Sequence, residues 1–495
     1  MISLRRSLSL WSIVTLVLAV PVWWTVVHAA ILSRAVDGGI FLSVSGGIKS
    51  GLPLYSGVWD NKDPFFFLAM TGASYLGHAA PFFMDLLWIS LGAFGGWLIA
   101  RSIMSADRAL FVALILVPLA LCGPFYIAGW SNTPGTALVL LIWGLAARRW
   151  NVAAGIVCGL LLFIKITLWP VALIGLLVML AFPAMRRGVI RALIALAATV
   201  AGSVALLAIL GWLGGYLDAF GRNRTYASDV IVYFGFEDSP FGHIAKLQAD
   251  WSALPSASIA WVPVVLVLLV LVFAIVFQAI RRSSASAERI LVTAWLAVSI
   301  LGVLAALALT YVWPHHAQAI YLPLAMAMIV LASLIPARWP FLLWAALILI
   351  FSVVGAGWGP GSSLADRVTT INANFDVARA EISEIPKDAR ILNTAPLGEF
   401  TYARLGSNDD RGYLADVRDG AVLACPAFHL YDFSPASAWS EMYECIQTVD
   451  AVLKTDAFDV FGNGGKAANV QPILNYVSTN FTCLRVEDRQ LCIRK

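Results

Sequence analysis

The chain has 495 residues, of which 60% are hydrophobic and 13% are charged, and its formal net charge is +4. Soluble globular proteins average roughly 45–50% apolar and about 25% charged residues. The composition therefore excludes an ordinary soluble enzyme and predicts an integral membrane protein with no nucleic-acid partner.

Apolar stretches long enough to cross a bilayer recur from the start of the chain to about residue 357. A spanning helix needs about 20 mainly apolar residues. The basic start with Arg5 and Arg6 is similar to a signal peptide, but apolar character continues to Ala30 without a clear small-residue cleavage site, which predicts an uncleaved first span. Eleven spans are predicted: 8–30, 82–101, 108–124, 132–147, 151–164, 167–182, 189–214, 258–280, 288–312, 317–335 and 339–357.

Charge is distributed unequally between the connections of these spans. Because cytoplasmic loops are enriched in Lys and Arg, the N-terminus is predicted to be cytoplasmic and the C-terminus to be extracytoplasmic. Most of the acidic residues of the first 357 fall on the outer side. The basic residues on the inner side are Arg5, Arg6, Arg101, Arg108, Arg148, Arg149, Arg186, Arg187, Arg191, Arg281, Arg282, Arg289 and Arg338.

Two predicted outer loops, 31–81 and 215–257, are long, and long loops without their own fold tend to be functional. In the first, residues 64–80 are apolar but interrupted by glycines, which predicts a helix lying at the interface. The cytoplasmic connections are too short to form a site. Any chemistry is therefore expected on the outer face.

The first outer loop carries the strongest candidate site. Asp37 follows the first span and is flanked by two glycines, which give backbone freedom, and Asp60, Lys62 and Asp63 come about two dozen residues later. Charges beside a bilayer are functional-site candidates, and a carboxylate can act as a general base. The alternative is a solvated loop in which Lys62 pairs with an Asp for structural reasons.

Further basic residues are candidates for contacts with phosphate, each with a structural alternative. Lys165 stands within an apolar stretch and could instead extend its side chain towards the interface. Arg222 and Arg224 could be a solvated pair. His315 and His316 begin a late span, and because adjacent histidines diverge on a helix, they are not expected to share a metal.

The tail, 358–495, is predicted to be a small extracytoplasmic α/β domain. A strand is expected at 390–394, a helix at 439–453, a buried strand at 458–462, a helix at 473–478 and a terminal hairpin at 483–493. Cysteines in such a domain suggest disulfides. The tail has four, for which three pairings are possible, and pairs local in sequence are favoured: Cys425–Cys445 and Cys483–Cys492.

The ordered motifs resemble those of GT-C-type membrane glycosyltransferases, in particular bacterial relatives of the dolichyl-phosphate-mannose protein mannosyltransferases and the lipid A aminoarabinose transferase. The resemblance covers about residues 10–335. Asp63 stands where the family's Asp-x-Lys-Pro-Pro has its first Pro, Leu54 is inserted before Tyr55, and His316 stands where Tyr is usual. The matching segments are Asp37, 51–55, 59–64, 155–165, Phe220, Asn223, Tyr226, 314–316 and Pro323.

This resemblance implies a polytopic α-helical membrane protein of about 11 transmembrane helices, with 1–357 as the catalytic domain. Its donor would be a sugar carried on a polyprenyl phosphate in the outer leaflet of the cytoplasmic membrane, and its acceptor a glycan, lipid or protein. Asp37 matches the catalytic base of an inverting transfer. The substrate-binding candidates are Asp60, Lys62, Asp63, Lys165, Arg222, Arg224, Tyr226, His315 and His316.

No cofactor or metal is expected, since the sequence shows no convincing metal cluster. Two other classes of function stay open: a non-catalytic transporter or flippase of lipid-linked glycans, and an envelope scaffold. A flippase needs polar contacts on both sides of its cavity, whereas the carboxylates here are on the outer side. A scaffold does not need an Asp at position 37.

Overall fold

A computed structural model provides the structure of this chain. It describes residues 10–32, 36–49, 51–58, 60, 62–122, 131–221, 268–270, 272–275, 277–278, 286–310, 318–334, 389, 391–393, 436–454, 467–486 and 489–495.

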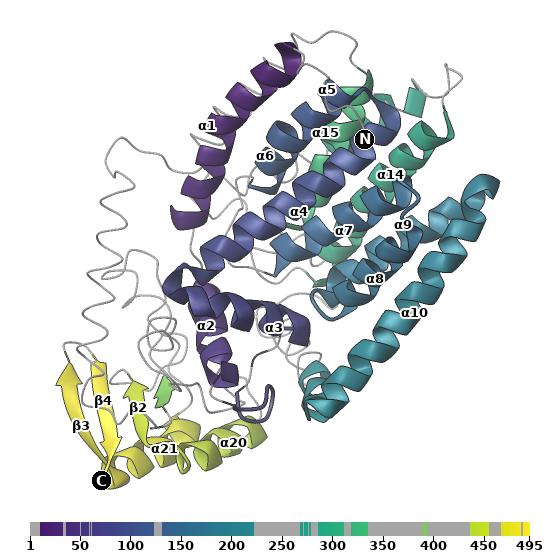
Figure 1. The fold of residues 1–495 in the computed structure, drawn as a ribbon. Coiled ribbons are helices and arrows are strands. Elements are labelled where there is room, and N and C mark those ends of the chain that lie inside the picture. The colour runs from purple at the N-terminus through teal and green to yellow at the C-terminus, as the bar shows by residue number, and fades with distance from the viewer. Residues whose placement is uncertain are drawn as a thin grey trace, which may run out of the picture.

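Apolar helices make up the described part of the first 334 residues, and Figure 1 shows them packed side by side. Short connections join consecutive helices, for example Met104 and Ser105 between α4 and α5. The elements are α1 (Leu10–Leu32), α2 (Val36–Lys49), α3 (Pro64–Ala73), η1 (Ser74–Ala79), α4 (Ala80–Ile103), α5 (Ala106–Phe111), η2 (Val112–Leu116), α6 (Val117–Leu121), α7 (Asn132–Ala147), α8 (Asn151–Leu162), η3 (Ile166–Leu168), α9 (Trp169–Val178), η4 (Met179–Ala181), η5 (Pro183–Met185), α10 (Arg186–Ile209), α14 (Ala287–Thr310) and α15 (Tyr321–Leu334).

Within the described residues, three helices are long and apolar enough to cross a membrane: Ala80–Ile103, Pro183–Ile209 and Ala287–Ala308. Shorter apolar helices lie in the other described regions where spans are predicted. The predicted span 258–280 is described only in fragments and 339–357 lies outside the described residues, so the number eleven stays a prediction.

The predicted span 108–124 is not one regular helix. It consists of α5, a π-helical turn η2 and α6. Pro118 lies near the start of α6, and because proline has no N–H, it interrupts the regular hydrogen bonds of a helix. Apolar composition predicted the span, but it does not report such local changes of winding.

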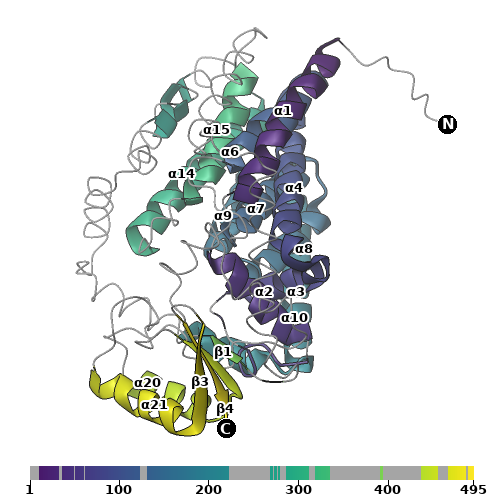
Figure 2. The ribbon, with the colours of Figure 1, turned by 90° about the vertical axis from the view of Figure 1, so that its left-hand side faces the viewer.

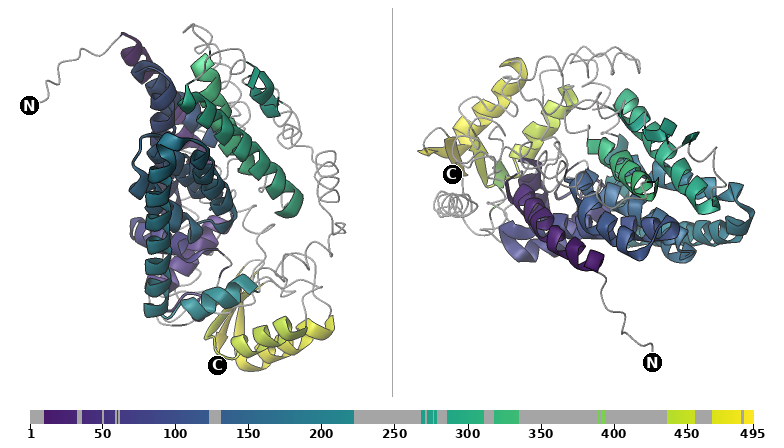
Figure 3. Two further views of the ribbon diagram at one scale, coloured as in Figure 1. Left: turned by 90° about the vertical axis from the view of Figure 1, so that its right-hand side faces the viewer. Right: turned by 90° about the horizontal axis from the view of Figure 1, so that it is seen from above.

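Small residues and tryptophans organise the interior of the helical part. A Cβ atom on Gly95 of α4 would lie 2.5 Å from the backbone of Leu140 in α7, so the absence of a side chain allows these helices to touch, as is common in membranes. Trp143 of α7 and Trp295 of α14 stack at 5.5 Å between ring centroids. Each indole N–H donates to a carbonyl of α9, at Ala172 and Gly175 respectively. Figure 3 shows α14 and α15, in green, along one flank of the bundle.

The first outer loop predicted at 31–81 is largely helical. Asp37 lies in the first turn of α2, where the helix dipole favours an acidic residue, rather than in an irregular segment with the backbone freedom expected of its glycines. The ten-residue α3 is too short to span a bilayer. These two helices and the loop between them lie at one end of α4, and α5 lies at its other end (Figure 1).

A four-stranded sheet with two helices forms the described C-terminal part. Its strand order is β1-β2-β4-β3, with β1 parallel to β2 and the other pairs antiparallel. Trp439, Met442 and Ile473 of the helices pack with Val452 of the sheet in one apolar core. Figure 2 shows this unit beyond the end of the bundle that carries α2 and α3. The elements are β1 (Ile391–Asn393), α20 (Ala436–Ile446), β2 (Ala451–Lys454), α21 (Ala467–Asn480), β3 (Phe481–Val486) and β4 (Arg489–Arg494).

The helix predicted at 439–453 was too long. It ends at Ile446, where the N–H groups of Gln447 and Thr448 close a tight turn, and Ala451–Lys454 forms strand β2 instead. The apolar pattern of the short strand continues that of the helix, so that periodicity did not separate them. The strand predicted at 458–462 lies outside the described residues.

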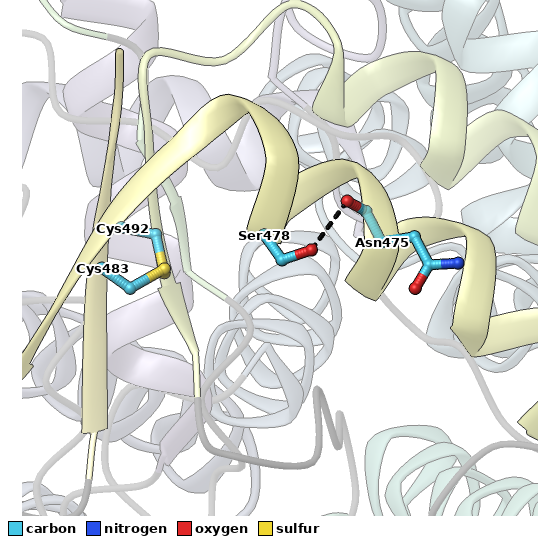
Figure 4. The surroundings of a disulfide bond; sticks show 4 residues. All are labelled: Asn475, Ser478, Cys483 and Cys492. Atoms are coloured by element: carbon cyan, nitrogen blue, oxygen red, sulfur yellow. Dashed lines mark hydrogen bonds between the residues drawn. A yellow bond between two sulfur atoms is a disulfide. The ribbon is translucent and has the colours of Figure 1, made fainter.

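The C-terminal hairpin carries a disulfide bond. Cys483 of β3 and Cys492 of β4 are directly paired and disulfide-bonded, beside the end of α21 where the Ser478 hydroxyl donates to the Asn475 carbonyl (Figure 4). Cys445 is also disulfide-bonded, and Cys425 lies outside the described residues.

Arg494 ties this hairpin to the end of α20. Its guanidinium donates to the carbonyls of Val449 at 2.6 Å, Gln447 at 2.9 Å and Ile446 at 3.2 Å. It also lies 4.9 Å from the centroid of the Phe481 ring. The last carbonyls of a helix have no partners within the helix, so a cation here stabilises the helix end.

Candidate functional site

A tight turn shapes the first outer loop ahead of its charged residues. The N–H groups of Gly57 and Val58 both donate to the carbonyl of Pro53, at 2.8 and 3.1 Å. Tyr55 has a φ of 73°, in the left-handed region that a bulky residue rarely adopts. Such strain persists only where surrounding contacts stabilise it, and the Tyr55 hydroxyl supplies one by donating to the carbonyl of Lys62 at 2.7 Å.

Asp60 and Lys62 form the second feature of this loop. Asp60 is 2% exposed, and its Oδ1 accepts a hydrogen bond from the Lys62 N–H at 2.9 Å. The Lys62 ammonium lies 4.0 Å from the same oxygen and 5.5 Å from the centroid of the Phe41 ring. Asp60 thus orders the local backbone, and the Lys62 ammonium lies against α2.

Asp63 joins three segments that are far apart in the sequence. Its Oδ2 accepts the Ile166 N–H at 3.0 Å, directly after Lys165, and its Oδ1 accepts the Tyr216 hydroxyl at 3.0 Å. The rings of Tyr55 and Tyr216 lie 5.7 Å apart. We call Tyr55, Asp63, Ile166 and Tyr216 the Asp63 junction.

Backbone contacts reinforce this junction. The Phe65 N–H donates to the Phe163 carbonyl at 2.8 Å, and a Cβ atom on Gly215 would lie 2.8 Å from the Tyr55 Cβ. Gly215 thus allows the helix at 213–221 to approach the turn closely. The start of the predicted second outer loop is therefore fixed against the first.

Lys165 lies in the connection between α8 and η3, within reach of the start of α7. Its ammonium donates to the Ser131 hydroxyl at 3.0 Å. A Cβ atom on Gly135 would lie 2.8 Å from the Lys165 Cγ, so the glycine makes room for the lysine stem. Asn132, which follows Ser131, donates to the Oε1 of the fully buried Gln318 at 3.3 Å. The lysine thus reaches a polar group of side chains on α7 and just before α15.

The charged groups of this site influence one another. Burial raises the pKa of the Asp63 carboxyl, whereas the Ile166 N–H and then the Lys165 charge lower it. Burial, and after it the like charge of Lys62, lowers the pKa of Lys165 to about 8, against an opposing effect of Asp63. Burial also raises the pKa of the Tyr55 and Tyr216 hydroxyls, so both stay protonated and can donate. The charges of Lys62 and Lys165 therefore influence each other.

Asp37 belongs to the helix against which Lys62 packs. Positions 37 and 41 are four residues apart on α2, which places them on the same face and about 6 Å apart along the axis. Phe41 of that face contacts Lys62, Phe66 and Phe67. The structure describes the backbone of Asp37 but not its side chain.

The predicted site residues fall into two groups. The structure brings together Asp60, Lys62, Asp63 and Lys165 near α2. Among the described residues, no three His, Cys, Asp or Glu side chains are grouped closely enough to hold a metal ion. The other predicted residues lie outside the described part of the chain: Arg222, Arg224, Tyr226, His315 and His316.

The sequence did not single out several residues that shape the site. Tyr216 follows two glycines at the end of a predicted span, and Ser131 begins a polar run ahead of another. Gln318 was visible only as a polar residue at the start of a span. The sequence analysis also did not single out Asp85 of α4, which is 1% exposed, although an ionisable residue within a spanning helix is itself a functional-site signal.

Comparison with known proteins gives structural likeness without sequence likeness. No family model and no curated protein matches the sequence. Among solved structures, an oligosaccharyltransferase from Archaeoglobus fulgidus, crystallised with zinc and sulfate, has a TM-score of 0.48 at 13% identity, covering 89% of this chain and 68% of that chain. The AglB oligosaccharyltransferase of the same organism, in complex with an inhibitory peptide and a dolichol-phosphate, has a TM-score of 0.47 at 13% identity, covering 89% and 69%.

A third solved structure, ArnT from Cupriavidus metallidurans bound to undecaprenyl phosphate, has a TM-score of 0.41 at 12% identity and covers 97% of both chains. At these identities and scores, the function has to be inferred from the residues of this chain.

Proposed function

We propose that this protein is a membrane glycosyltransferase that moves a sugar from a polyprenyl phosphate to an acceptor of the cell envelope. The observation that carries the proposal is a hydrogen bond: Asp63, which follows Lys62, accepts the N–H of Ile166, which follows Lys165, so that two lysines from segments about 100 residues apart come to one carboxylate. The two ammonium groups stand beside two acids, Asp60 and Asp63, and each has several N–H donors, so that both can also bind a further anionic group. Such a site suits an anionic group such as a phosphate.

In this proposal the reaction proceeds in one displacement. The acceptor hydroxyl oxygen forms a bond to the anomeric carbon while the bond from that carbon to the phosphate oxygen breaks, which inverts the configuration. Asp37 takes the proton of the acceptor hydroxyl. The leaving phosphate keeps the bonding electron pair, and Lys62 and Lys165 stabilise its charge, with Arg222 and His315 as further candidates.

The place of α2 supports this role for Asp37. The residue lies one turn from Phe41, whose ring contacts the Lys62 ammonium. A base on that turn and a phosphate near the lysines would lie on two sides of a sugar. Asp60 and Asp63 are less suited to be the base, since each already accepts a hydrogen bond from a backbone N–H.

We further propose that the reaction occurs on the outer face of the cytoplasmic membrane. The first loop and the Lys165 connection lie at the end of the bundle opposite to α5 (Figure 1). Of the acidic residues that the positive-inside rule assigns to the outside, the described Asp60, Asp63 and Asp218 belong to this end. The C-terminal sheet would then be extracytoplasmic and available to cover the site or hold the acceptor.

The test is turnover of a panel of polyprenyl-phosphate sugars by the full chain in nanodiscs, with membrane extract as the source of acceptor. Asp37→Asn is expected to lower the rate at least about 100-fold, because general bases contribute typically 10²–10⁴-fold. Asp107→Asn is the matched control, because Asp107 accepts a hydrogen bond from Ser12 of α1 at 3.0 Å and lies on α5, at the opposite end.

Normal turnover by the Asp37 variant would remove it as the base. Donor binding without turnover in any extract would favour a transporter of lipid-linked glycans. An absence of donor binding by the unmodified protein would contradict the glycosyltransferase proposal altogether.

A further inference from the structure

Asp63 has a different environment from Asp60, the other acid of the first loop whose side chain the structure describes. Both of its carboxylate oxygens accept hydrogen bonds, and the two donors belong to other parts of the chain. Asp60 instead accepts from the loop itself, at Lys62. Hydrogen bonds to a charged group are stronger than those between neutral groups. Asp63 therefore connects segments that lie far apart in the sequence.

Asp63 and one of its two donors each follow a lysine of the proposed site. Lys62 directly precedes Asp63, and Lys165 directly precedes Ile166, whose N–H the carboxylate accepts. The carbonyl of Lys62 in turn accepts the Tyr55 hydroxyl at 2.7 Å. A movement of the Asp63 carboxylate would thus displace both lysine backbones.

The third partner connects the site to the helix at 213–221. Tyr216 donates to Asp63, and its ring lies against those of Tyr55 and Phe163. This helix directly precedes the region in which Arg222 and Arg224 stand. The junction therefore joins both long predicted outer loops to the Lys165 connection.

We propose that Asp63 is a positioning residue, whose carboxylate holds Lys62 and Lys165 on two sides of one anion site by binding Ile166 and Tyr216. The anion in question rests on the proposed function, whereas the connection of the three segments does not. The role differs from the direct substrate contact expected from the sequence. An Asp at this position, where the resembling family has a proline, then has a physical reason, because proline has no side chain to accept these bonds.

Two variants separate position from charge. In Asp63→Asn, the amide oxygen can accept the Ile166 N–H while the amide nitrogen donates to the Tyr216 oxygen, so the connection is kept and the charge is lost. In Asp63→Ala, both bonds are lost. Tyr216→Phe removes one of them. The matched controls are Asp107→Asn and Asp107→Ala at the opposite end, and Tyr75→Phe, since Tyr75 is 77% exposed.

The experiment measures two properties of the full chain in nanodiscs: hydrogen exchange of the segments 62–66 and 163–168 by mass spectrometry, and the binding isotherm of a polyprenyl phosphate. In Asp63→Ala we expect exchange in both segments to rise and the Kd to increase about tenfold, the scale of a lost hydrogen bond to a charged group. The number of binding sites per protein stays unchanged. Tyr216→Phe shows a smaller change in the same direction, and Asp63→Asn stays within about threefold of the unmodified protein.

Three outcomes would overturn the proposal. The first is unchanged exchange at 163–168 in Asp63→Ala. The second is a loss of binding sites at constant Kd, which indicates a merely structural role. The third is an equal loss of affinity in Asp63→Asn, which indicates that charge and not position matters. If the unmodified protein binds no polyprenyl phosphate, the proposed function fails, and the exchange measurements alone decide whether Asp63 connects the segments.

Discussion

Asp63 and Arg494 are both charged side chains that hold distant segments together, yet their surroundings differ. Arg494 donates to three backbone carbonyls at the end of α20 and lies over Phe481. Asp63 accepts from one backbone N–H and one tyrosine, and two lysines stand beside it. The partners of Arg494 are mainly carbonyls at and just after the end of a helix, where backbone groups are commonly left unpaired, whereas the surroundings of Asp63 gather further charge.

The comparison teaches how to separate a structural charge from a functional one. A charge that serves the fold is matched by acceptors or donors that the fold itself supplies. A charge at a binding site can stand among like-charged groups whose mutual repulsion the fold has to overcome, as Lys62 and Lys165 do in the proposed site. Variants of the two clusters should therefore affect different properties.

The largest effect expected is on the stability of the C-terminal sheet. Arg494→Ala removes several charge-assisted bonds and leaves helix-end carbonyls unpaired, so the free energy of unfolding of this unit should fall by roughly 3–5 kcal/mol. Hydrogen exchange of 436–454 would measure it. Arg489→Ala, at the start of the same strand, is the control. A change in the Kd for polyprenyl phosphate with an intact sheet would contradict the separation of the two clusters.

The converse variant addresses the site. Lys62→Ala combined with Lys165→Ala should weaken binding of polyprenyl phosphate about 100-fold, since each lost charge-assisted contact corresponds to roughly a factor of ten. The melting temperature has to be measured alongside, because the variant removes the repulsion between the lysines but also leaves the buried Asp60 without its cation. Lys49→Ala, a lysine at the end of α2 that lies 4.7 Å from the centroid of the Tyr75 ring, is the control. Unchanged binding in the double variant would show that the anion site lies elsewhere.

A third prediction concerns the disulfides of the tail. Alkylation before reduction should leave Cys483, Cys492 and Cys445 unmodified and, after unfolding, modify Cys122 and Cys158, which are free and buried. The Cys483–Cys492 bond closes a loop of about ten residues. Its reduction should therefore lower the free energy of unfolding by about 2–3 kcal/mol by the chain-entropy model. Peptide mapping by mass spectrometry identifies the modified cysteines, and unfolding with and without reductant gives the change in stability. Free thiols at Cys483 and Cys492 in unreduced protein would remove this pair.

The smallest effect is a pH dependence of anion binding. The pKa of Lys165 is lowered to about 8, so this lysine is charged below that pH and neutral above it. The affinity for polyprenyl phosphate should therefore fall up to about tenfold as the pH rises from 7 to 9. Folding has the opposite sign: since the unfolded pKa is higher, burial of the charge costs stability below pH 8, and that cost disappears as the pH rises above it.

Lys165→Arg separates this effect from others, because arginine stays charged throughout the range. The Kd of this variant should not change between pH 7 and 9. The second ionisation of a phosphate monoester lies near pH 6, so the ligand itself does not titrate there. If the affinity of the arginine variant still falls between pH 7 and 9, the titration belongs to another group.

The membrane class and most of the described helices followed from the sequence alone. Long apolar stretches have few alternatives in lipid, because every backbone polar group must be bonded internally. The sequence also singled out Lys62, Asp63 and Lys165, because charge is rare in such a chain and therefore conspicuous. The ends of helices and strands were harder to predict from the sequence. The strand at Ala451–Lys454, for example, extends the apolar pattern of α20.

Only the tertiary structure decided which of these residues meet. Apolar composition predicts that a helix is buried in lipid or protein but not which helix it packs on, so the stacking of Trp143 on Trp295 was hidden. Likewise, nothing in the local sequence of Asp63 indicates that its partners are Ile166 and Tyr216, about 100 and 150 residues away. A charged residue is evident from its chemistry, but its role depends on the groups that folding brings to it, and those contacts are set by packing over the whole chain.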